Sequence, residues 1–568
     1  MSAVLYRAAA GAGRAPFAIL RGSNRIPTTG QLLVEGGDAR IALDPHSGTN
    51  RYGCAPFPDS SLAAFGSSTA SVISEAAFSA ADRLRDRLAD TPAGARAEFC
   101  ELELARMRLE LTQYVGTGGR SAAEIVFAAS GTDVHLIAAC LARSDHTLPP
   151  LVIMVAGAET GAGVPAAVAG CHFSTRSAWS SNIAAGSPVG PDAALPVMHI
   201  ALRGADGAPL TPDAIDTAVV TAALRAAARG RRVLVVVNDL TKTGMLAPTP
   251  ACAAALRAAL PEQLEVLVDA CQFRVAPSTV RAYLGQGFMV AVTGSKFLGG
   301  PSFSGALLVP QASAEHYRHL AVGRLLSAYS ARSDWPFGWR VAASLPQAAN
   351  PGLMLRWEAA LAELRALRTV PEVEIGNFLR RFAAAVTERL ADQDVFRTVP
   401  VPEIDRRPLV GNSGWDSIPT IFPFRLRRSS GGAFLNPEEM QAVYRLLQAD
   451  LAARAVRQRP GAPAKITRLR CLLGQPVVCG NDGTAPFSAL RLSVGARQIT
   501  AATRDGRAAG IIEEALAVLD KTAWLAQAGW LGDGSRLGRL LQAQRSGLPR
   551  SLSTAATGPA VLPAFGQR

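Results

Sequence analysis

The pattern of apolar and polar residues changes in the middle of the chain, from about residue 124 to residue 310. Short apolar runs alternate there with amphipathic helical stretches such as Pro212–Arg229 and Pro250–Ala259. The runs are mostly continuous, which is typical of strands buried on both faces of a parallel sheet. The predicted strands are Glu124–Ala129, Leu151–Ala156, Met198–Leu202, Val233–Val237, Leu264–Val268, Phe288–Val292 and Ala306–Val309. This alternation predicts an α/β fold with a mostly parallel central sheet, whose ligands bind at the carboxyl ends of the strands.

The flanking segments predict further domains. Residues 1–60 are rich in Gly, Pro and Ser, and residues 61–115 show Leu and Ala at helical spacing. A long helix, Met354–Asp392, is predicted to lead to a smaller α+β domain. Its predicted elements are the strands Thr420–Leu426 and Leu490–Val494 and the helices Pro437–Ala453 and Gly506–Ala526. We therefore expect an irregular arm at 1–60, a large domain at 61–350, a connecting helix with the small domain at 351–544, and a disordered tail at 545–568.

The net charge of the chain gives only a weak indication of the kinds of ligand or partner that it binds. Its 58 Lys and Arg against 45 Asp and Glu give a net charge of +13. The Arg residues are scattered through Ala-rich helices such as Ala222–Arg231, without the dense basic runs and interleaved aromatics of a nucleic-acid surface. A compositional bias explains this pattern best, so nucleic acid is not expected as a partner. A positive cleft for a phosphate or a carboxylate also fits it.

The cysteines and the lengths of the apolar stretches indicate the compartment in which the chain is expected. The eight cysteines are scattered, with no Cys-x-x-Cys pair and no His–Cys cluster at zinc spacing, so no metal site is predicted. In so long a chain this usage is typical of reduced thiols, and hence of a cytoplasmic protein. No stretch is long and apolar enough to predict a membrane span.

A first candidate motif, Ser130-Gly131-Thr132, follows the first predicted strand of the sheet and precedes the helical stretch His135–Ala142. A strand, a small turn and a helix place free backbone N–H groups and the positive end of a helix dipole at one point. That geometry binds phosphate. A plain helix cap gives the same local pattern, so the motif gains weight only beside other motifs.

Two further candidates follow later predicted strands. Asp269 comes directly after Leu264–Val268, where a buried carboxylate needs a cationic partner such as a protonated pyridine nitrogen. Lys296 follows Phe288–Val292 in the segment Val-Thr-Gly-Ser-Lys-Phe-Leu-Gly-Gly-Pro. A desolvated lysine forms imines readily, and the glycines after it let the backbone approach a flat ligand.

Taken in order, these motifs resemble those of fold-type-I pyridoxal 5'-phosphate (PLP) enzymes, especially the class V aminotransferase and cysteine desulfurase group. The resemblance covers roughly residues 60–530. In that group a small-residue turn, an Asn loop, Asp-x-x-Gln, Ser/Thr-x-x-Lys and Arg-x-Ser-x-Gly follow one another. The matching residues are Ser130-Gly131-Thr132, Asn238, Asp269 with Gln272, Thr293 with Lys296, and Arg491-Leu-Ser493-Val-Gly495. The segment from Lys296 to Pro301 also resembles the lysine loop of selenocysteine synthase.

The resemblance implies a role for each matched residue. Lys296 would hold PLP as a Schiff base, and Asp269 would pair with the ring nitrogen. Arg491 would bind a substrate carboxylate, a geometry that guanidinium suits well. The rest of the cofactor site would comprise Ser130, Gly131, Thr132 and Thr293 toward the phosphate, Asn238 and Gln272 toward the phenolic oxygen, and Ser295 beside the lysine. The resemblance also implies a homodimer, with active sites formed between two subunits.

The chain departs from the group at two points. Many members place His directly before the lysine, where this chain has Ser295. Many also stack a His on the ring, yet the equivalent stretch Gly157–Gly163 has none; Thr160 is a candidate to lie near the ring, and no stacking group is assigned. His172 is expected to be structural. In the polar patch of the arm, Asn50 and Arg51 are candidates to reach the substrate, as N-terminal segments do in this superfamily.

The reaction stays open among several alternatives. Transamination or a related α-carbanion reaction on an amino acid, with Lys296 as general base, is the first hypothesis. Sulfur transfer would need a mobile nucleophilic thiol, for which Cys471 and Cys479 lie just before Arg491 in the sequence. A lyase or decarboxylase, a binding protein that lost turnover, and an enzyme with an RNA-linked substrate are further alternatives.

Overall fold

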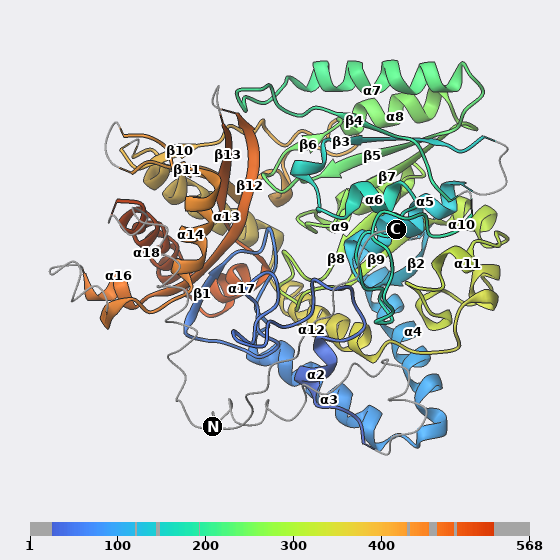
Figure 1. The fold of residues 1–568 in the computed structure, drawn as a ribbon, viewed down its shortest axis with the longest axis horizontal. Coiled ribbons are helices and arrows are strands. Elements are labelled where there is room, and N and C mark those ends of the chain that lie inside the picture. Colours follow the sequence, from blue (N-terminus) through green and yellow to red (C-terminus); the bar gives the residue numbers. More distant parts are fainter. Residues whose placement is uncertain are drawn as a thin grey trace, which may run out of the picture.

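The computed structural model describes residues 25–116, 118–119, 122–143, 148–191, 193–392, 394–428, 432–453, 463–481 and 485–527 (Figure 1). The predicted tail at 545–568 lies outside the described residues, as does part of the predicted arm. Two sheets organise the described residues, one in each half of the molecule (Figure 1).

The larger sheet has the strand order β2-β9-β8-β7-β5-β3-β4. Its strands are β2 (Ala123–Ala128), β3 (Leu151–Val155), β4 (Val197–Ile200), β5 (Val233–Asp239), β7 (Leu264–Ala270), β8 (Met289–Thr293) and β9 (Gly305–Pro310), with the short β6 (Leu246–Ala247) beside β5. On this path β9 alone runs antiparallel to its neighbours. All seven predicted strands are present, with ends that differ by at most two residues. The predicted α/β fold with a mostly parallel sheet is confirmed.

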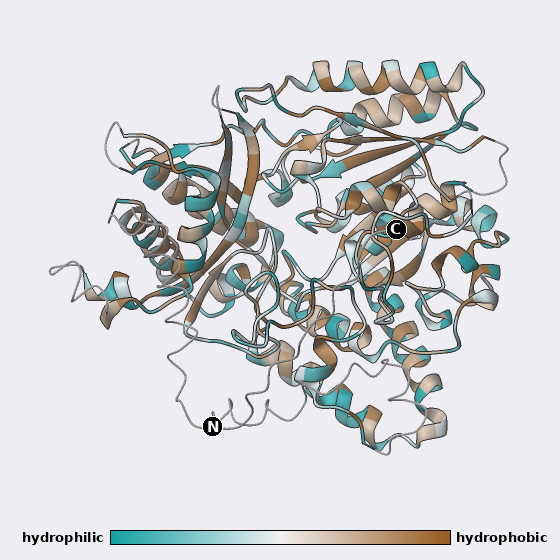
Figure 2. Ribbon diagram, in the orientation of Figure 1, coloured by the Kyte–Doolittle hydropathy of each residue, from teal (hydrophilic) through white to brown (hydrophobic). Residues whose placement is uncertain are grey.

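Both faces of this sheet are buried, as continuous apolar strands require. Along β5, Leu234 and Val236 pack into one apolar cluster and Val235 packs into the other. Figure 2 shows apolar colour running along these strands. The helices of this half are α5 (Gly131–Arg143), α6 (Val164–Val168), α7 (Pro212–Ala227), α8 (Pro250–Ala259), α9 (Pro277–Gly285), α10 (Gln311–Tyr317) and α11 (Gly323–Leu326). The crossover helices between parallel strands are therefore where the pattern predicted them.

The second sheet has the order β1-β12-β13-β11-β10 and is packed against the C-terminal helices (Figure 1). Its strands are β1 (Leu62–Phe65), β10 (Phe396–Thr398), β11 (Ile421–Leu426), β12 (Arg470–Asn481) and β13 (Pro486–Ser493). Its helices are α14 (Pro437–Leu447), α16 (Ala464–Arg468), α17 (Ala496–Arg504) and α18 (Ala508–Gln527). The start of the predicted helical stretch at 61 is wrong, because Leu62–Phe65 pairs in parallel with Arg470–Leu473 of β12. Such a pairing over 400 residues of sequence leaves no local signal.

The predicted connecting helix is two helices, α12 (Pro351–Leu367) and α13 (Glu372–Leu390). Pro371 lies between them as the N-cap of α13. Proline lacks the N–H that a continuous helix would need and disfavours helical backbone at the residue before it, so the break falls here. Two earlier helices, α3 (Glu75–Asp90) and α4 (Arg96–Val115), pack against α12.

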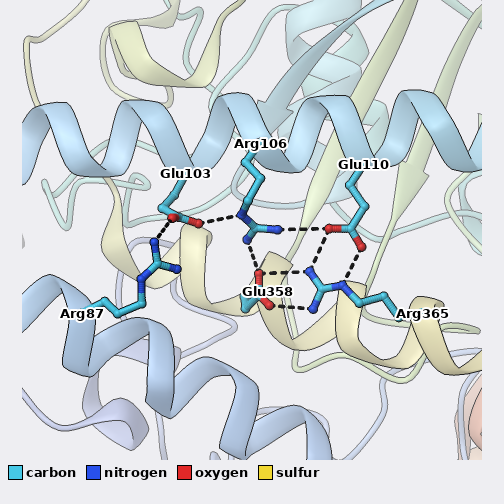
Figure 3. Close-up of polar contacts among 6 residues, drawn as sticks. All are labelled: Arg87, Glu103, Arg106, Glu110, Glu358 and Arg365. Carbon is cyan, nitrogen blue, oxygen red and sulfur yellow. Dashed lines mark hydrogen bonds and ion pairs between the residues drawn. The ribbon is translucent and has the colours of Figure 1, made fainter.

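An ion-pair network joins α3, α4 and α12 (Figure 3). Arg106 pairs with Glu103 at 2.8 Å and Glu110 at 3.1 Å, and also with Glu358 of α12. Arg365 pairs with Glu110 and Glu358, both at 2.7 Å. Networks stabilise more than isolated surface pairs, so these residues fix α12 to the N-terminal helices.

Candidate functional site

One cavity lies at the carboxyl ends of three strands of the larger sheet, beyond β2, β7 and β8. Residues of the N-terminal segment and of β12 and β13 complete its lining. The three strand-end motifs predicted from the sequence all meet there. The polar and charged lining residues are Arg40, Arg51, Tyr52, Ser68, Thr69, Ser130, Thr132, His135, Lys242, Asp269, Thr293, Ser295, Lys296, Ser302, Gln475 and Arg491.

The Ser130-Gly131-Thr132 turn forms the N-terminus of α5 at this cavity. The Ser130 Oγ caps the helix, accepting hydrogen bonds from the N–H groups of Thr132 at 3.2 Å and Asp133 at 3.4 Å. Glycine is required at 131, because a Cβ there would lie 2.8 Å from the Cys271 Sγ. The positive end of a 13-residue helix therefore lies at the cavity wall, as an anion site requires.

Arg40 is a residue of this anion site that the sequence did not reveal. Its Nη2 lies 3.3 Å from the Ser130 Oγ and 3.2 Å from the Thr132 Oγ1. Asp38 holds it in a fork, with Nε at 2.9 Å from Oδ1 and Nη2 at 2.5 Å from Oδ2. The guanidinium also lies 4.8 Å from the ring centroid of Phe303. The only sequence signal was an acid two residues before an arginine in an otherwise irregular segment.

Asp269 ends β7 and is held from three sides. Its Oδ1 accepts a hydrogen bond from the Cys271 N–H at 3.1 Å, and its Oδ2 accepts one from the Asn238 Nδ2 at 3.0 Å. The same Oδ2 lies 3.2 Å from the Nε2 of His135. Burial raises the pKa of Asp269, but the charges of His135 and, to a smaller extent, Lys296 lower it by more. The pKa of this carboxyl therefore lies well below its ordinary value. The cavity therefore presents a carboxylate, ready for a cationic nitrogen.

His135 was not predicted as a site residue. It lies one turn along α5 from Gly131, whose carbonyl oxygen is 2.7 Å from its Nδ1. With a carbonyl at one ring nitrogen and the Asp269 carboxylate 3.2 Å from the other, the site suits a protonated imidazolium, although its Nε2 makes no aligned hydrogen bond within the described residues. Burial lowers the pKa of His135, but Asp269 more than offsets this, so the pKa is raised. The spacing of four residues from Gly131 was the signal available.

Asn238 and Gln272 are not among the lining residues of the cavity. The Nδ2 of Asn238 in β5 donates a hydrogen bond to Asp269, which lies opposite it on β7. The Gln272 Nε2 donates to the Ser68 carbonyl at 3.1 Å, and its Oε1 lies 3.4 Å from the Nε of Arg274. Their predicted contact with a ring oxygen is not supported by this geometry. Asn238 positions Asp269, and Gln272 ties the N-terminal segment to the strand end.

Lys296 lies in the turn after β8 and lines the cavity together with Thr293 and Ser295. Its carbonyl accepts a hydrogen bond from the Ser71 Oγ at 2.9 Å, which fixes the turn to the N-terminal segment. The Thr293 Oγ1 donates to the Cys271 carbonyl at 2.6 Å rather than to the cavity. Asp269 lies near the end of β7, and Lys296 lies in the turn after the neighbouring strand β8, so the sheet brings both groups to one place.

Two glycines on either side of Lys296, Gly294 and Gly300, allow close packing of the turn against a helix. A Cβ on Gly294 would lie 2.4 Å from the Ala360 Cβ, and one on Gly300 would lie 2.8 Å from it. Ala360 belongs to α12, which therefore packs directly on this turn. The sequence pattern indicated small residues at this turn, and at Gly300 the close neighbour is Ala360 of α12.

Arg491 of β13 is 1% exposed and lines the cavity, as predicted for a substrate contact. Its Nη1 donates to the Lys242 carbonyl at 3.1 Å, and its Nη2 to the Thr69 Oγ1 at 2.8 Å and the Gln475 carbonyl at 2.5 Å. Within the described residues its buried Nε has no hydrogen-bond partner. Burial lowers the pKa of Arg491 to about 10.

Lys242 is a second lysine of the cavity, in the loop after β5, and was not predicted as a site residue. Its Nζ donates to the Ala158 carbonyl at 3.1 Å. Burial, followed by the charges of Arg491 and Lys296, lowers the pKa of Lys242 to about 8, against the smaller opposite effects of Glu159 and Cys479. In the sequence this segment was singled out only for Asn238, four residues earlier.

The arm contributes Arg51 to the cavity lining, and Asn50 to the turn that carries it. The Asn50 Oδ1 accepts from the Tyr52 N–H at 2.9 Å, and its Nδ2 donates to the Ser302 Oγ at 3.0 Å. Arg51 itself is exposed, and its carbonyl accepts from the Gln475 Nε2 at 2.9 Å. Of these two sequence candidates, the structure brings Arg51 to the cavity.

Several other candidates lie away from the cavity lining. Cys471 and Cys479 lie on β12 with their thiols donating to the carbonyls of Leu447 and Val477, and burial raises their pKa values to about 12 and about 11. The Nδ1 of His172 is 2.6 Å from the Tyr329 hydroxyl, which fits the expected structural role. Thr160 is buried and donates to the Gly157 carbonyl at 3.3 Å, while Gly161 and Ala162 line the cavity beside it.

One group of three potential metal ligands occurs among the described residues. The ligand atoms of His135, Asp269 and Cys271 lie within 4.8 Å of one another, although no metal site was predicted. Burial and the Asp269 charge raise the pKa of the Cys271 thiol well above its ordinary value, which opposes the thiolate that a metal would bind. The His135–Asp269 pair accounts for these contacts without a metal.

No protein-family model matches the sequence, and no curated protein sequence matches it. Solved structures with a similar fold include a cysteine desulfurase, CsdA from Escherichia coli, at 15% identity and a TM-score of 0.45, covering 81% of this chain and 94% of that one. A C-DES variant with glycine covalently linked to its PLP cofactor has 13% identity and a TM-score of 0.47, covering 86% and 99%. Serine palmitoyltransferase from S. paucimobilis, with PLP and myriocin bound, has 13% identity and a TM-score of 0.44, covering 81% and 87%. Identities this low transfer no activity to this chain.

No helix within the described residues is long and apolar enough to cross a membrane.

Proposed function

We propose that this chain is a PLP-dependent enzyme that acts on an amino acid through Lys296. One observation carries the proposal: the α5 N-terminus, the Asp269 carboxylate and Lys296 line a single cavity at the carboxyl ends of β2, β7 and β8. A phosphate, a cationic ring nitrogen and an aldehyde are the three groups that these residues suit. PLP carries all three.

The donor set of the cavity fits that cofactor. The turn at 130–132 and Arg40 would hold the phosphate, since both present positive charge at the same wall. Asp269 would hold the ring nitrogen, because its pKa is already well below its ordinary value. Lys296 lines the same cavity and would bond the aldehyde carbon. When bound, PLP supplies an electrophilic carbon for the substrate amine and a ring that withdraws electrons from the α-carbon.

The residues of this chain would then divide the work of transamination or a related α-carbanion reaction. Asp269 would keep the proton on the ring nitrogen, and His135 and Asn238 would keep Asp269 in place. Lys296, once displaced from the cofactor by the substrate amine, would carry a proton at its Nζ to and from the substrate α-carbon. Arg491 would hold the substrate carboxylate, because it is a buried cation that lines the cavity. A decarboxylase fits less well, because its carboxylate must leave.

The sulfur-transfer alternative finds no support in this geometry. A persulfide-forming cysteine must be a reachable thiolate, yet burial holds the pKa values of Cys471 and Cys479 at about 12 and about 11. Cys471→Ala and Cys479→Ala should therefore leave turnover intact. Loss of turnover in either single variant, with the fold retained, would favour sulfur transfer over transamination.

The quaternary state and compartment are proposals too. We propose a homodimer, to be measured by light scattering of the purified protein. All eight cysteines, each within the described residues, are free, which supports a reducing compartment such as the cytoplasm.

Reductive trapping of the cofactor tests the central proposal. Purified protein reconstituted with PLP should show a visible absorption band that borohydride removes. Mass spectrometry of the reduced protein should then find the cofactor mass on the peptide that carries Lys296. Lys296→Ala should lose both signals, whereas Lys242→Ala should keep the covalent adduct on Lys296. A wild-type protein that takes up no PLP, or an adduct on Lys242, would overturn the assignment.

A further inference from the structure

The substrate side of the cavity contains more positive charge than one α-carboxylate needs. The lining includes the cations Arg40, Arg51, Lys242, Lys296 and Arg491, and Asp269 is its one acid among the described residues. Two of these charges have local partners or tasks: Asp38 forks onto Arg40, and Lys296 would bond the cofactor. The cations that remain are Arg51, Lys242 and Arg491, and none of them pairs with a carboxylate in the part of the chain that the structure describes.

These three cations are tied together by backbone contacts. The Arg491 guanidinium donates to the Lys242 carbonyl at 3.1 Å and to the Gln475 carbonyl at 2.5 Å. The side chain of Gln475 in turn donates to the Arg51 carbonyl at 2.9 Å. The three residues therefore belong to one region of the lining, on loops and strands other than the α5 turn that suits the cofactor phosphate.

Acids that could neutralise this region are already engaged. Glu159, the nearest acid that acts on Lys242, accepts from the Arg203 Nε at 2.7 Å and from the Thr243 Oγ1 at 2.6 Å. Arg491 has a buried Nε without a hydrogen-bond partner among the described residues, as do arginines away from the cavity such as Arg232 and Arg318. What distinguishes Arg491 is that it lines the cavity, where a ligand can accept from its guanidinium.

We propose that the substrate is an amino acid with a second acidic group, bound with its α-carboxylate at Arg491 and its side-chain anion between Arg51 and Lys242. This assignment rests on the proposed function, because it takes the α5 turn to be occupied by the cofactor phosphate. The second group has the chemistry of a carboxylate, a sulfonate or a phosphate. An anion held by two cations at a partly dehydrated wall binds well above its uncharged counterpart.

Spectral titration of the PLP-loaded protein tests the substrate class. Aspartate, glutamate, cysteate and phosphoserine would be compared with asparagine, glutamine and serine, following the change in the visible band as each is added. We expect each acid to bind about tenfold more tightly than its neutral counterpart, the fold-change for one well-placed charge. The ranking of the acids identifies the second group as carboxylate, sulfonate or phosphate.

Three variants separate the proposal from general weakening of the site. In Lys242→Met and Arg51→Met, the ratio of the affinities for aspartate and asparagine should fall toward one. Arg229→Met, at an exposed position after α7, removes an equal charge away from the cavity and should leave that ratio unchanged. If the protein binds PLP on Lys296 but prefers neutral amino acids, or if Lys242→Met weakens both ligands equally, the substrate class is wrong and the proposed function survives. If no adduct forms on Lys296, the proposed function itself fails.

Discussion

Removing the carboxylate of Asp269 should reverse the direction in which the protein shifts the pKa of His135. In the native protein Asp269 raises the pKa of His135 above 6.5, although burial alone lowers it. In Asp269→Asn the burial remains and the opposing charge is gone, so the pKa of His135 should fall below 6.5. The measurement is a pH titration of the histidine ring signals by NMR, with His135→Asn to assign the resonance.

The size of this coupling follows from the geometry. The His135 Nε2 and the Asp269 Oδ2 are 3.2 Å apart in a buried site, so the Coulomb energy at an effective dielectric of 20 is about 5 kcal/mol. Desolvation of both groups offsets part of this energy. A double-mutant cycle of His135→Asn and Asp269→Asn, measured by urea unfolding of cofactor-free protein, should therefore give a coupling of about 2–3 kcal/mol.

The pH dependence of the cycle has a definite sign. The pKa of His135 is raised on folding, so its contribution is complete below its ordinary value of 6.5 and is lost as pH rises through the raised value. The pKa of Asp269 is lowered, so its contribution is complete above 3.8 and is lost as pH falls through the lowered value. The coupling should peak between these ordinary values. A coupling that is near zero at pH 5.5, or equal at pH 5.5 and pH 9, would refute the ion pair.

Three further predictions use the same protein. Because burial and neighbouring cations lower the pKa of Lys242 to about 8, the affinity of PLP-loaded protein for aspartate should fall as pH rises through about 8, and Lys242→Arg should remove that step in a spectral titration. Gly131→Ala should release PLP at least about tenfold faster on dialysis, since its Cβ would press on the Cys271 Sγ at 2.8 Å, and an unchanged rate would show that the turn can open freely. Glu358→Gln should lower the free energy of unfolding by about 1 kcal/mol, more than the exposed Glu101→Gln does, and a difference that persists at 1 M salt would rule out an ionic origin.

The elements of the large sheet could be predicted because their signals are local. Most strands from β2 to β9 on the sheet path are largely apolar runs bounded by turn residues, and such runs occur where both faces are buried. The small sheet gave weaker signals. Its β1 is four residues long and takes its partner from β12 more than 400 residues later. The break of the connecting helix was readable at Pro371, but the amphipathic pattern on both sides obscured it.

The same distinction explains which site residues could be predicted. Asp269 and Lys296 lie at the carboxyl ends of neighbouring parallel strands, in β7 and in the turn after β8, so the fold class alone places them together. Ser130-Gly131-Thr132 lies between strand β2 of the same sheet and helix α5. His135 was within reach of helical spacing from Gly131. Arg40 was not, because its place depends on how an irregular segment lies against the α5 turn. Sequence reasoning was therefore strongest where regular elements fix the position of a side chain.

The substrate side of the cavity is the part that regular elements do not fix. Arg51 comes from a turn held by Asn50, and Gln475 comes from a register shift in β12 between Gly474 and Val477. Arg491 reaches both the Lys242 loop and that irregular stretch, so the two halves of the molecule meet at its guanidinium. Substitutions that move β12 relative to the large sheet should then change substrate preference before they change cofactor retention. Variants of Gln475 that bind aspartate more weakly but release PLP as slowly as the wild type would show this separation directly.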